Sequence, residues 1–419
     1  MEKSKLTSNE EAFGTFLARH FSPSREIDTP ERLLGRERSL TEIRRAFASP
    51  GRQVFVYGER GVGKTSLATT AAHLNSSSDA RPIFISCDSE NAFSRAISSI
   101  YTQAVSQRFD VKTHVKSDNH ELNFGARVFE TKSQNSQVTT YQEPLVETAD
   151  DAKAIINFIS QQNGERVIVI DEMDRITCDQ DKRLFAEFSK AISSLENPAK
   201  IIFVGIGETI EDLIGQHASY GRYIEPIKLE TLPLNTLWTI VSQAAQEIEY
   251  EIENNFLQRI ALISDGFPHY VHLLGQCIFW DLFDQKRNKL SPEIFSAAVR
   301  AAIEKSEVSI KSDYQRATEK TRNTVQFELS LWALADTSET RRQVSSIYSD
   351  SLLPIVKKKP EIEMNRDLLN RRLLDLRGDR HGNVVTGHGA GWFSFTQNVF
   401  RGFVRMKAFE SGVDLRRQD

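Results

Sequence analysis

The sequence has few cysteines and no long apolar run. Its three cysteines, Cys87, Cys178 and Cys277, are far apart and odd in number, which argues against a disulfide framework or a zinc site. We expect them to be small buried apolar side chains. No stretch reaches the uninterrupted apolar length of a membrane span, and residues 1–11 are too polar to resemble a secretory signal. These absences predict a cytoplasmic protein without membrane contact.

The length and charge of the chain predict several domains and an uneven charge distribution. With 419 residues and 39% hydrophobic content, the chain can form two or three cores. The net charge is −4, but residues 341–419 contain fifteen Lys and Arg against nine Asp and Glu, so residues 1–340 carry −10. A basic C-terminal part suggests contact with a polyanion. The alternative is a solvated basic face, or one that docks on the acidic body.

A glycine-rich motif follows the first predicted strand, at residues 54–57. Residues 58–65 read Gly-Glu-Arg-Gly-Val-Gly-Lys-Thr, which matches the G-x-x-x-x-G-K-[ST] phosphate-binding loop. In such a loop backbone N–H groups surround the phosphates, and the following helix points its positive end at them. We expect Lys64 to meet the β and γ phosphates and Thr65 to bind Mg²⁺. The predicted cofactors are ATP and Mg²⁺, and the predicted nucleotide-binding residues here are Gly58, Glu59, Arg60, Gly61, Val62, Gly63, Lys64, Thr65 and Ser66.

A second buried strand ends in two carboxylates. Residues 166–170 read Arg-Val-Ile-Val-Ile and are followed by Asp171 and Glu172. Continuous Val and Ile are typical of a strand buried on both faces, and an open sheet binds its ligand at the carboxyl ends of its strands. We expect Asp171 to hold Mg²⁺ through water and Glu172 to orient or deprotonate the attacking water. A solvated strand end is the alternative interpretation.

Arg222 is a further catalytic candidate. A buried strand at residues 200–205 continues through a helix to Ser219-Tyr220-Gly221-Arg222, just before a short strand at residues 227–229. In ring-forming ATPases an arginine one helix beyond the fourth strand faces the neighbouring subunit and supplies charge to the transferring phosphoryl group. A surface salt bridge is the alternative.

The alternation of strands and helices predicts an α/β fold with a parallel sheet covered by helices on both faces. We assign a lead-in segment to residues 1–31 and the P-loop ATPase core to residues 32–230, with an inserted hairpin region at 110–148. A helical lid is expected at residues 231–315. A C-terminal winged-helix domain is expected at residues 316–419.

Five sequence features together resemble the AAA+/STAND group of P-loop ATPases, in the branch of origin-recognition-like and archaeal-type ATPases. They are Gly35-Arg36-Glu37, the phosphate loop, Ile170-Asp171-Glu172, Ser219-x-x-Arg222 and Gly266-Phe267-Pro268. The likeness covers about residues 32–410. It implies that the segment with Leu34 and Arg36 lies against the adenine, and that the lid box with Pro268 contacts the nucleotide.

Two departures from the family pattern imply slow hydrolysis. The fourth strand usually ends in a polar sensor residue, Asn, Thr or Arg, whereas this sequence offers only Glu208 or Thr209. No sensor arginine stands near Gly266. The resemblance therefore implies an ATPase that converts ATP and water to ADP and phosphate slowly, with the nucleotide acting mainly as a switch.

The C-terminal part has the outline of a winged helix. Three helices and a hairpin are predicted, at residues 325–334, 344–356, 364–376 and 384–395. If residues 364–395 bind double-stranded DNA, the third helix enters the major groove while Arg380 and His388 touch phosphate. In STAND switches the equivalent domain often packs on the core, so a regulatory or assembly role is the alternative.

The predicted function is an ATP-binding ATPase that uses binding and Mg²⁺-dependent hydrolysis to switch conformation or assembly, as a homo-oligomer, with a winged helix that engages DNA or a partner protein. One alternative is a DNA- or partner-binding regulatory module in which the nucleotide is a structural ligand. Another is a defence or signalling scaffold that acts with a separate effector protein.

Overall fold

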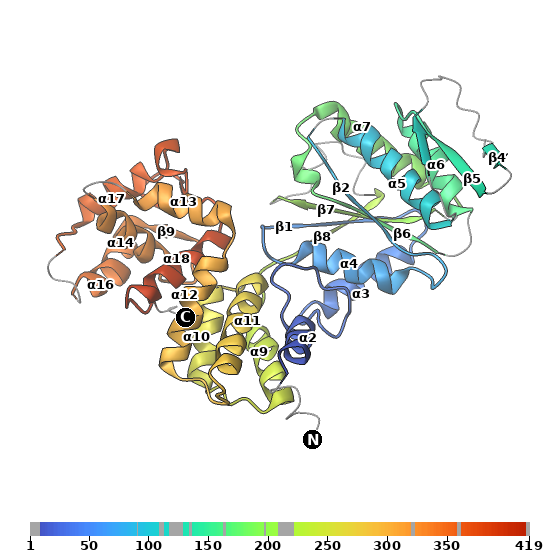
Figure 1. Ribbon diagram of the computed structural model, residues 1–419. Coiled ribbons are helices and arrows are strands. Elements are labelled where there is room, and N and C mark those ends of the chain that lie inside the picture. Colours follow the sequence, from blue (N-terminus) through green and yellow to red (C-terminus); the bar gives the residue numbers. More distant parts are fainter. Residues whose placement is uncertain are drawn as a thin grey trace. The chain divides into compact units, whose positions relative to one another are not determined.

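The chain folds as two units. The computed structural model describes residues 9–89, 91–108, 113–116, 129–133, 136–161, 165–196, 198–207, 222–319, 323–357 and 362–415 (Figure 1). Unit 1 comprises Met1–Arg25, Arg60–Val62 and Thr231–Asp419, and unit 2 comprises Glu26–Glu59 and Gly63–Glu230. The predicted lid and C-terminal part both fall within unit 1.

Unit 2 is built on a five-stranded sheet with the order β2-β6-β7-β1-β8. The strands are β1 (Gln53–Gly58), β2 (Ile83–Ser86), β6 (Val167–Asp171), β7 (Lys200–Ile206) and β8 (Ile224–Lys228). All neighbouring strands in this sheet pair in parallel. The predicted parallel α/β core is confirmed, and the carboxyl ends of β1 and β6 lie at one edge, separated by β7.

Helices cover both faces of this sheet. The helices α3 (Glu37–Phe47) and α4 (Lys64–Asn75) lie on one face, and α5 (Ala92–Arg108), α6 (Ala149–Ser160) and α7 (Asp179–Ile192) lie on the other (Figure 1). Phe93, Ile155 and Phe188 from the second group pack with Ile168 and Phe203 of the sheet in a fully buried core. The runs of Val and Ile are therefore buried on both faces of the sheet, as is typical of parallel strands.

The two outer strands of the sheet are protected in different ways. On β2, the backbone carbonyls of Phe84 and Pro82 accept hydrogen bonds from the side-chain amides of Gln103 and Gln107 of α5, at 3.0 and 3.4 Å. On β8, Pro226 lies in the middle of the strand and has no N–H to offer. Proline within a sheet is confined to such edge strands.

The inserted region contains the predicted hairpin. The strands β4 (Phe129–Ser133) and β5 (Ser136–Glu143) pair antiparallel, and β3 (Thr113–Lys116) pairs in parallel with β5. These strands form a sheet of their own with the order β3-β5-β4.

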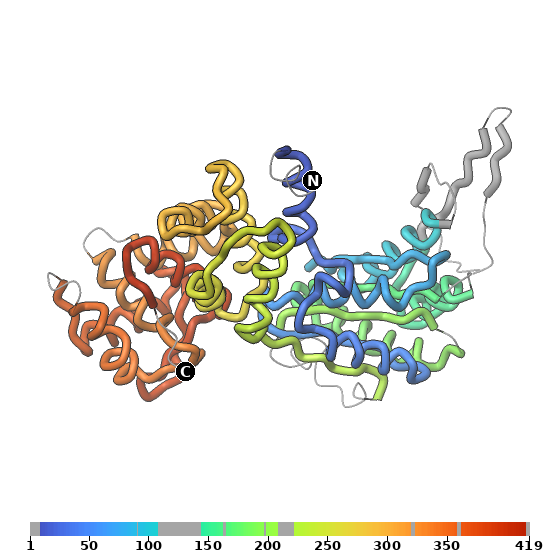
Figure 2. Tube along the Cα trace, turned by 90° about the horizontal axis from the view of Figure 1, so that it is seen from below, coloured from blue at the N-terminus to red at the C-terminus, as the bar shows by residue number. Residues whose placement is uncertain are grey.

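Unit 1 contains a helical bundle made of α9 (Leu234–Ile248), α10 (Asn254–Ser264), α11 (Pro268–Asp284) and α12 (Pro292–Lys305). The N-terminal helix α2 (Glu10–His20) packs on α11, as Figures 1 and 2 show. The ring of Phe13 stacks on Phe283 at 4.4 Å between centroids, and Phe21 lies against Gly275. The expected lead-in segment thus contributes apolar side chains to this bundle.

The rest of unit 1 follows the predicted order of helices and hairpin. Its elements are α13 (Val308–Thr318), α14 (Thr324–Ala335), β9 (Arg341–Gln343), α15 (Val344–Ser346), η3 (Ile347–Leu352), α16 (Leu353–Lys357), α17 (Arg366–Asp375), η4 (Asp379–His381), β10 (Val385–Gly387), β11 (Trp392–Phe395) and α18 (Val399–Glu410). Strand β9, which sequence patterns did not predict, pairs with β11 to complete an antiparallel sheet, β10-β11-β9.

The three cysteines differ in exposure. Cys87 and Cys277 are buried, and burial raises the pKa of their thiols to about 12 and about 11. Cys178 is exposed just before α7, so the prediction of a buried side chain is wrong there. Across the described residues, no helix combines the length and apolarity needed to cross a membrane.

Candidate functional site

The phosphate loop connects β1 to α4 and depends on its glycines. Gly58, Gly61 and Gly63 have φ of 145°, 83° and 93°, a range that glycine adopts readily. A Cβ atom on Gly58 would lie 2.3 Å from the backbone oxygen of Leu229. No side chain caps the start of α4 at Gly63. The first N–H groups of a helix point out of such an end, which suits an anion.

Lys64 lies at the start of α4 and is largely buried, with 8% of its surface exposed. Its Nζ donates a hydrogen bond to the backbone oxygen of Glu59 across the loop, at 2.7 Å. This hydrogen bond holds the ammonium group against the backbone of the loop. Glu59 itself is exposed.

Thr65 and Asp171 meet although they are distant in sequence. Thr65 Oγ1 donates to Asp171 Oδ2 at 2.7 Å, and the N–H of Glu172 donates to Asp171 Oδ1 at 2.6 Å. Burial raises the pKa of Asp171 above its ordinary value, and these two hydrogen bonds offset part of that effect. The carboxylate carries an unfavourable desolvation cost in the free protein that a bound cation would relieve.

Glu172 has a strained backbone and a held side chain. Its φ of 59° is in the left-handed region, which non-glycine residues occupy at an energetic cost. Oε1 lies 2.7 Å from the guanidinium of Arg175, and Oε2 accepts a hydrogen bond from the hydroxyl of Ser86. Ser86 ends β2, the strand beside β6. Sequence patterns revealed neither partner, although Arg175 follows Glu172 by only three residues.

Asp174 is a third polar residue that the sequence analysis missed. Its Oδ1 accepts a hydrogen bond from the N–H of Ile206 at 2.8 Å, and this contact fixes the end of β7 against the segment after β6. The predicted sensor positions Glu208 and Thr209, together with Ser219, lie outside the described residues.

Arg36, in the segment expected to lie against the adenine, donates a hydrogen bond within the protein. Arg36 is buried and its NH2 donates to the backbone oxygen of Glu230 at 2.6 Å. Burial lowers the pKa of Arg36 to about 10. Leu34 is half-buried, so the apolar surface that this segment offers comes from Leu34 rather than from the guanidinium of Arg36.

The remaining candidates of unit 2 are Ser66 and Arg222. Ser66, the third residue of α4, accepts a hydrogen bond from the N–H of Ile27 at 3.1 Å. Arg222 is exposed and stands two residues before β8. The structure does not bring Arg222 to Asp171 or Glu172 by any described contact.

Four candidates belong to unit 1. Within that unit Arg60 forms an ion pair with Glu307 at 2.6 Å. A methyl group added to Gly61 would lie 3.1 Å from Val399 and 3.5 Å from Phe267. Val62 is buried, and Pro268 is the first residue of α11.

The donor set fits Mg²⁺ better than a transition metal. Mg²⁺ prefers oxygen ligands and commonly keeps several waters while it binds one or two carboxylates and substrate phosphates. The hydroxyl of Thr65 and the carboxylate of Asp171 provide such oxygens. Within the described residues, no group of three or more His, Cys, Asp or Glu side chains could hold a metal by itself. The site therefore suits a cation that arrives with a phosphate ligand.

The sheet order, the glycine-rich loop after β1 and the carboxylates after β6 define a P-loop ATPase core. Sequence comparison then places the chain more narrowly: the model of a family described as an ATPase domain predominantly from Archaea matches residues 33–274. The chain belongs to this family, and the predicted archaeal-type ATPase membership is confirmed. Among curated proteins, none matches the chain.

Several solved structures are similar to this chain, and the first of those described here supports the fold. A Walker-type ATPase of Pyrococcus abyssi is 18% identical with a TM-score of 0.53, over 91% of this chain and 99% of that one. Cdc6p from Pyrobaculum aerophilum is 14% identical with a TM-score of 0.43, over 93% and 98%. The Orc1 protein of Aeropyrum pernix, solved in complex with DNA, is 14% identical with a TM-score of 0.43, over 91% and 96%.

Replacing Asp171 by Asn should stabilise the protein without ligand. The pKa of Asp171 is raised in the folded state, so at neutral pH the folded protein carries a desolvation penalty that the unfolded chain lacks. We expect Asp171→Asn to raise the urea midpoint at pH 7 in EDTA and to abolish the stabilisation by Mg²⁺ and ATP. The advantage of Asn should shrink as the pH falls through the raised pKa, because the wild-type carboxyl group then becomes neutral. A lower midpoint for the variant at pH 7 would contradict this account.

Proposed function

We propose that this protein binds ATP and hydrolyses it slowly with Mg²⁺, and that the bound nucleotide switches its conformation or assembly. The observation that carries the proposal is the 2.7 Å contact between Thr65 of the phosphate loop and Asp171 at the end of β6. It joins the two predicted parts of the site in one place. The membership in an ATPase family supports the same reaction.

Each residue then has a distinct task. The N–H groups at the start of α4 and the Nζ of Lys64 bind the phosphates, while Thr65 and Asp171 hold Mg²⁺. When bound, Mg²⁺ supplies charge neutralisation on the phosphate oxygens. Glu172 orients the attacking water and accepts its proton at a carboxylate oxygen.

The contacts of Glu172 are consistent with slow turnover. Both of its carboxylate oxygens are occupied, one by Arg175 and one by Ser86. Each oxygen keeps a further lone pair for the attacking water, but the two partners fix the orientation of the carboxylate. If that orientation must change before the water can bind, turnover is slow, and the release of Ser86 would act as an on-switch for hydrolysis.

An assembly of copies of this chain would complete the site. Arg222 is exposed and close to the border strand β8. In a homo-oligomer the guanidinium would reach the phosphates bound by a neighbouring copy and stabilise the charge of the transferring phosphoryl group. The described residues do not test whether a separate effector protein binds this chain. Such a partner stays a prediction.

The C-terminal elements support a winged helix that meets DNA. Helix α17 would enter the major groove and the β10–β11 hairpin would form the wing, with Arg380 and His388 exposed. On β11, Trp392 is 37% exposed and lies under the guanidinium of Arg341 at 5.6 Å. An exposed indole and guanidinium on the wing suit a nucleic-acid surface.

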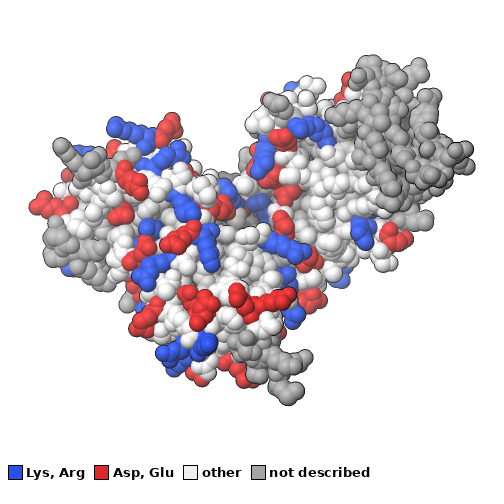
Figure 3. All heavy atoms as spheres, viewed as in Figure 1, with Lys and Arg blue, Asp and Glu red and all other residues white. Residues whose placement is uncertain are grey.

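A partner protein is the second candidate for this region. On the outer side of α17, Asp367 and Leu374 are exposed beside Arg371, and Leu374 is 45% exposed. The basic excess of the C-terminal part also supports DNA binding less than the sequence suggested, because Arg342, Arg401 and Arg405 are buried. On the face in Figure 3, basic and acidic side chains of unit 1 are interspersed rather than gathered by sign.

Replacing Lys64 by Ala should abolish nucleotide binding. The variant loses the one ammonium group of the phosphate loop, so the affinity for ATP should fall at least about 100-fold, the effect of a buried charged contact. Isothermal titration of the purified chain measures this. Lys190→Ala, which removes an exposed lysine of α7 in the same unit, is the control and should bind as the wild type does. Unchanged ATP affinity in Lys64→Ala would remove the basis of the proposed function.

Replacing Glu172 by Gln should separate binding from turnover. Glutamine keeps the shape of the side chain but cannot accept the proton of water, so kcat should drop at least about 100-fold while ATP affinity stays within about threefold. Phosphate release under saturating ATP gives the rate. The exposed Glu187 of α7 offers a matched control, Glu187→Gln. If Glu172→Gln turns over ATP at the wild-type rate, another group is the base. If the wild-type chain binds ATP but releases no phosphate with or without duplex DNA, the nucleotide is a structural ligand.

Replacing Arg371 by Ala should weaken binding to duplex DNA. One lost phosphate contact lowers the affinity several-fold and reduces the slope of log affinity against log salt by about 1. Fluorescence anisotropy with a labelled 20-base-pair duplex at several salt concentrations measures both. Arg287→Ala, an exposed arginine at the far end of the bundle, should change neither. Equal anisotropy curves for the wild type and both variants, or no binding by any of them, would leave a partner protein as the ligand of α17.

A further inference from the structure

The small sheet β10-β11-β9 of unit 1 packs one of its faces against the interior of that unit. Phe393 and Phe395 of β11 are buried on this face. Arg342 of β9 lies opposite Phe393 and is also buried, and its guanidinium donates a hydrogen bond to the backbone oxygen of Ala333 at 2.7 Å. Because successive side chains of a strand point to opposite faces, the neighbours of these residues lie on the other side of the sheet.

The other side of this sheet, which we name the outer sheet face, is accessible to solvent. It consists of Arg341, Gln343, Thr386, His388, Trp392 and Ser394. Trp392 lies opposite Gln343, and the N–H of His388 donates to the backbone oxygen of Trp392 at 2.8 Å. His388 Nε2 lies 2.8 Å from the hydroxyl oxygen of Ser394. Thr386 and Ser394 are half-buried, and the others are exposed.

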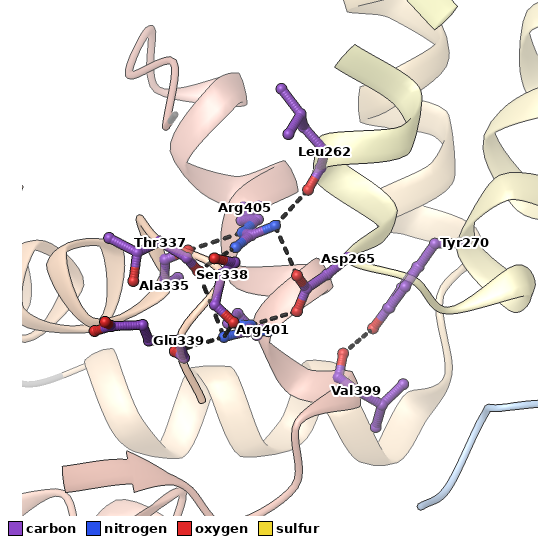
Figure 4. A network of polar contacts seen from close by, with 10 residues as sticks. All are labelled: Leu262, Asp265, Tyr270, Ala335, Thr337, Ser338, Glu339, Val399, Arg401 and Arg405. Carbon is purple, nitrogen blue, oxygen red and sulfur yellow. Dashed lines mark hydrogen bonds and ion pairs between the residues drawn. The ribbon is translucent and has the colours of Figure 1, made fainter. Parts of the chain in front are cut away.

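The chain that leads into β9 is fixed by two buried arginines of α18, as Figure 4 shows. Arg405 donates a hydrogen bond to the backbone oxygen of Thr337 at 2.8 Å, and Arg401 donates one to that of Glu339 at 2.9 Å. The buried carboxylate of Asp265 pairs with both guanidinium groups and so balances their charge. Strand β9 begins two residues after Glu339. The backbone that carries the outer sheet face is therefore held in place by contacts within unit 1.

Trp392 is the residue of the outer sheet face that suits a nucleobase. Of the four tryptophans, all of which lie within the described residues, it alone is exposed. The guanidinium of Arg341 lies over its ring. Flat aromatic side chains on a sheet bind unpaired bases by stacking, and an arginine beside the ring adds a cation–π contribution. The bases of an intact duplex are already stacked on one another, so such a ring favours bases that have no pairing partner.

The charge around this ring fits a phosphate backbone. The three strands read Arg-Arg-Gln, Val-Thr-Gly and Trp-Phe-Ser-Phe, and therefore contain no carboxylate. A second exposed arginine, Arg377, lies against the border strand β10, where a Cβ atom on Gly387 would be 2.8 Å from its guanidinium carbon. Glycine at this position leaves room for the guanidinium group. A stacking ring among positive charges is the combination with which proteins bind single strands.

We propose that the outer sheet face binds unpaired bases of DNA, with one base stacked on Trp392 and the adjoining phosphates bound by Arg341 and Arg377. The proposal rests on the proposed function in one respect, the contact of the C-terminal elements with DNA, and it names the form of DNA that is bound. All of its residues belong to unit 1. The protein would thereby recognise DNA whose strands are separated, which a duplex contact at α17 does not distinguish.

The test measures binding of the full chain, without ATP, to a labelled 20-nucleotide strand of thymidine by fluorescence anisotropy at several salt concentrations. Trp392→Ala should weaken binding at least about fivefold, because it removes the stacking of one base. The slope of log affinity against log salt should not change, because no charge is lost. Phe84→Ala, which removes an aromatic side chain that is 38% exposed on β2 of unit 2, is the matched control and should bind as the wild type does.

Two further variants separate stacking from a general loss of surface. Trp392→Phe keeps an aromatic ring, so its affinity for the strand should stay within about threefold of the wild type. The quenching of tryptophan fluorescence by the bound strand should be lost in this variant, since the indole that meets the base is gone. Arg341→Ala should weaken binding about threefold and reduce the salt slope by about 0.7, the effect of one phosphate contact on a single strand.

The outcomes distinguish the proposal from the contact with DNA on which it rests. A folded Trp392→Ala with the wild-type affinity for the thymidine strand overturns the proposal, as does an Arg341→Ala with wild-type affinity and salt slope where only that variant folds. A wild-type chain that binds the 20-base-pair duplex but not the strand also overturns it. If the wild-type chain binds neither, the proposed contact with DNA is wrong, and the proposal falls with it.

Discussion

The structure of the site depends on a carboxylate that is withdrawn from water at the carboxyl edge of a parallel sheet. Burial raises the pKa of Asp171, and the hydroxyl of Thr65, one backbone N–H and the charge of Lys64 offset only part of the cost. The core is arranged to bear this cost: β6 is buried on both faces, and Thr65 is brought to it by a loop that only glycines can form. Without ligand, the protein thus carries an unfavourable charge at the place where a cation and a phosphate would make that charge favourable. The site lowers the stability of the free protein and strengthens binding.

Charge in unit 1 is used for internal organisation as well as for the surface. Arg342, Arg401 and Arg405 are buried, and each donates to backbone oxygens at the ends of helices or strands. Their planar guanidinium groups present five N–H donors in a rigid fork, so each can serve several carbonyls at once. The basic excess counted in the C-terminal sequence is for this reason only partly a surface property. A polyanion would meet fewer cations than the count implies, and the choice between DNA and protein rests on α17 and the wing.

Much of the fold followed from sequence patterns, and the rest could not. The core strands β1, β6, β7 and β8 and the hairpin at β4–β5 were predicted because apolar runs and alternation depend on nearby residues. The contacts between distant residues that organise the site could not be predicted in this way. Ser86 with Glu172 and Asp174 with Ile206 join residues of separate elements, and Asp265 with Arg401 spans more than 130 residues. No local pattern marks such a partner. Strand β9 was missed because three residues are too few for alternation to register, and the exposure of Cys178 depends on its position before α7.

The two borders of the central sheet restrict how copies of this protein can associate. Many proteins join by extending one sheet into another through unpaired backbone groups at an outer strand. Here one carbonyl of β2, that of Phe84, and the carbonyl of Pro82 just before it are taken by Gln103 and Gln107, and β8 carries Pro226 where a partner strand would need a donor. A continuous sheet shared by two copies is accordingly disfavoured on either side. Rings or filaments of this chain would be assembled through helix surfaces and side chains. Such contacts can break and form again far more readily than the hydrogen bonds of a strand pair.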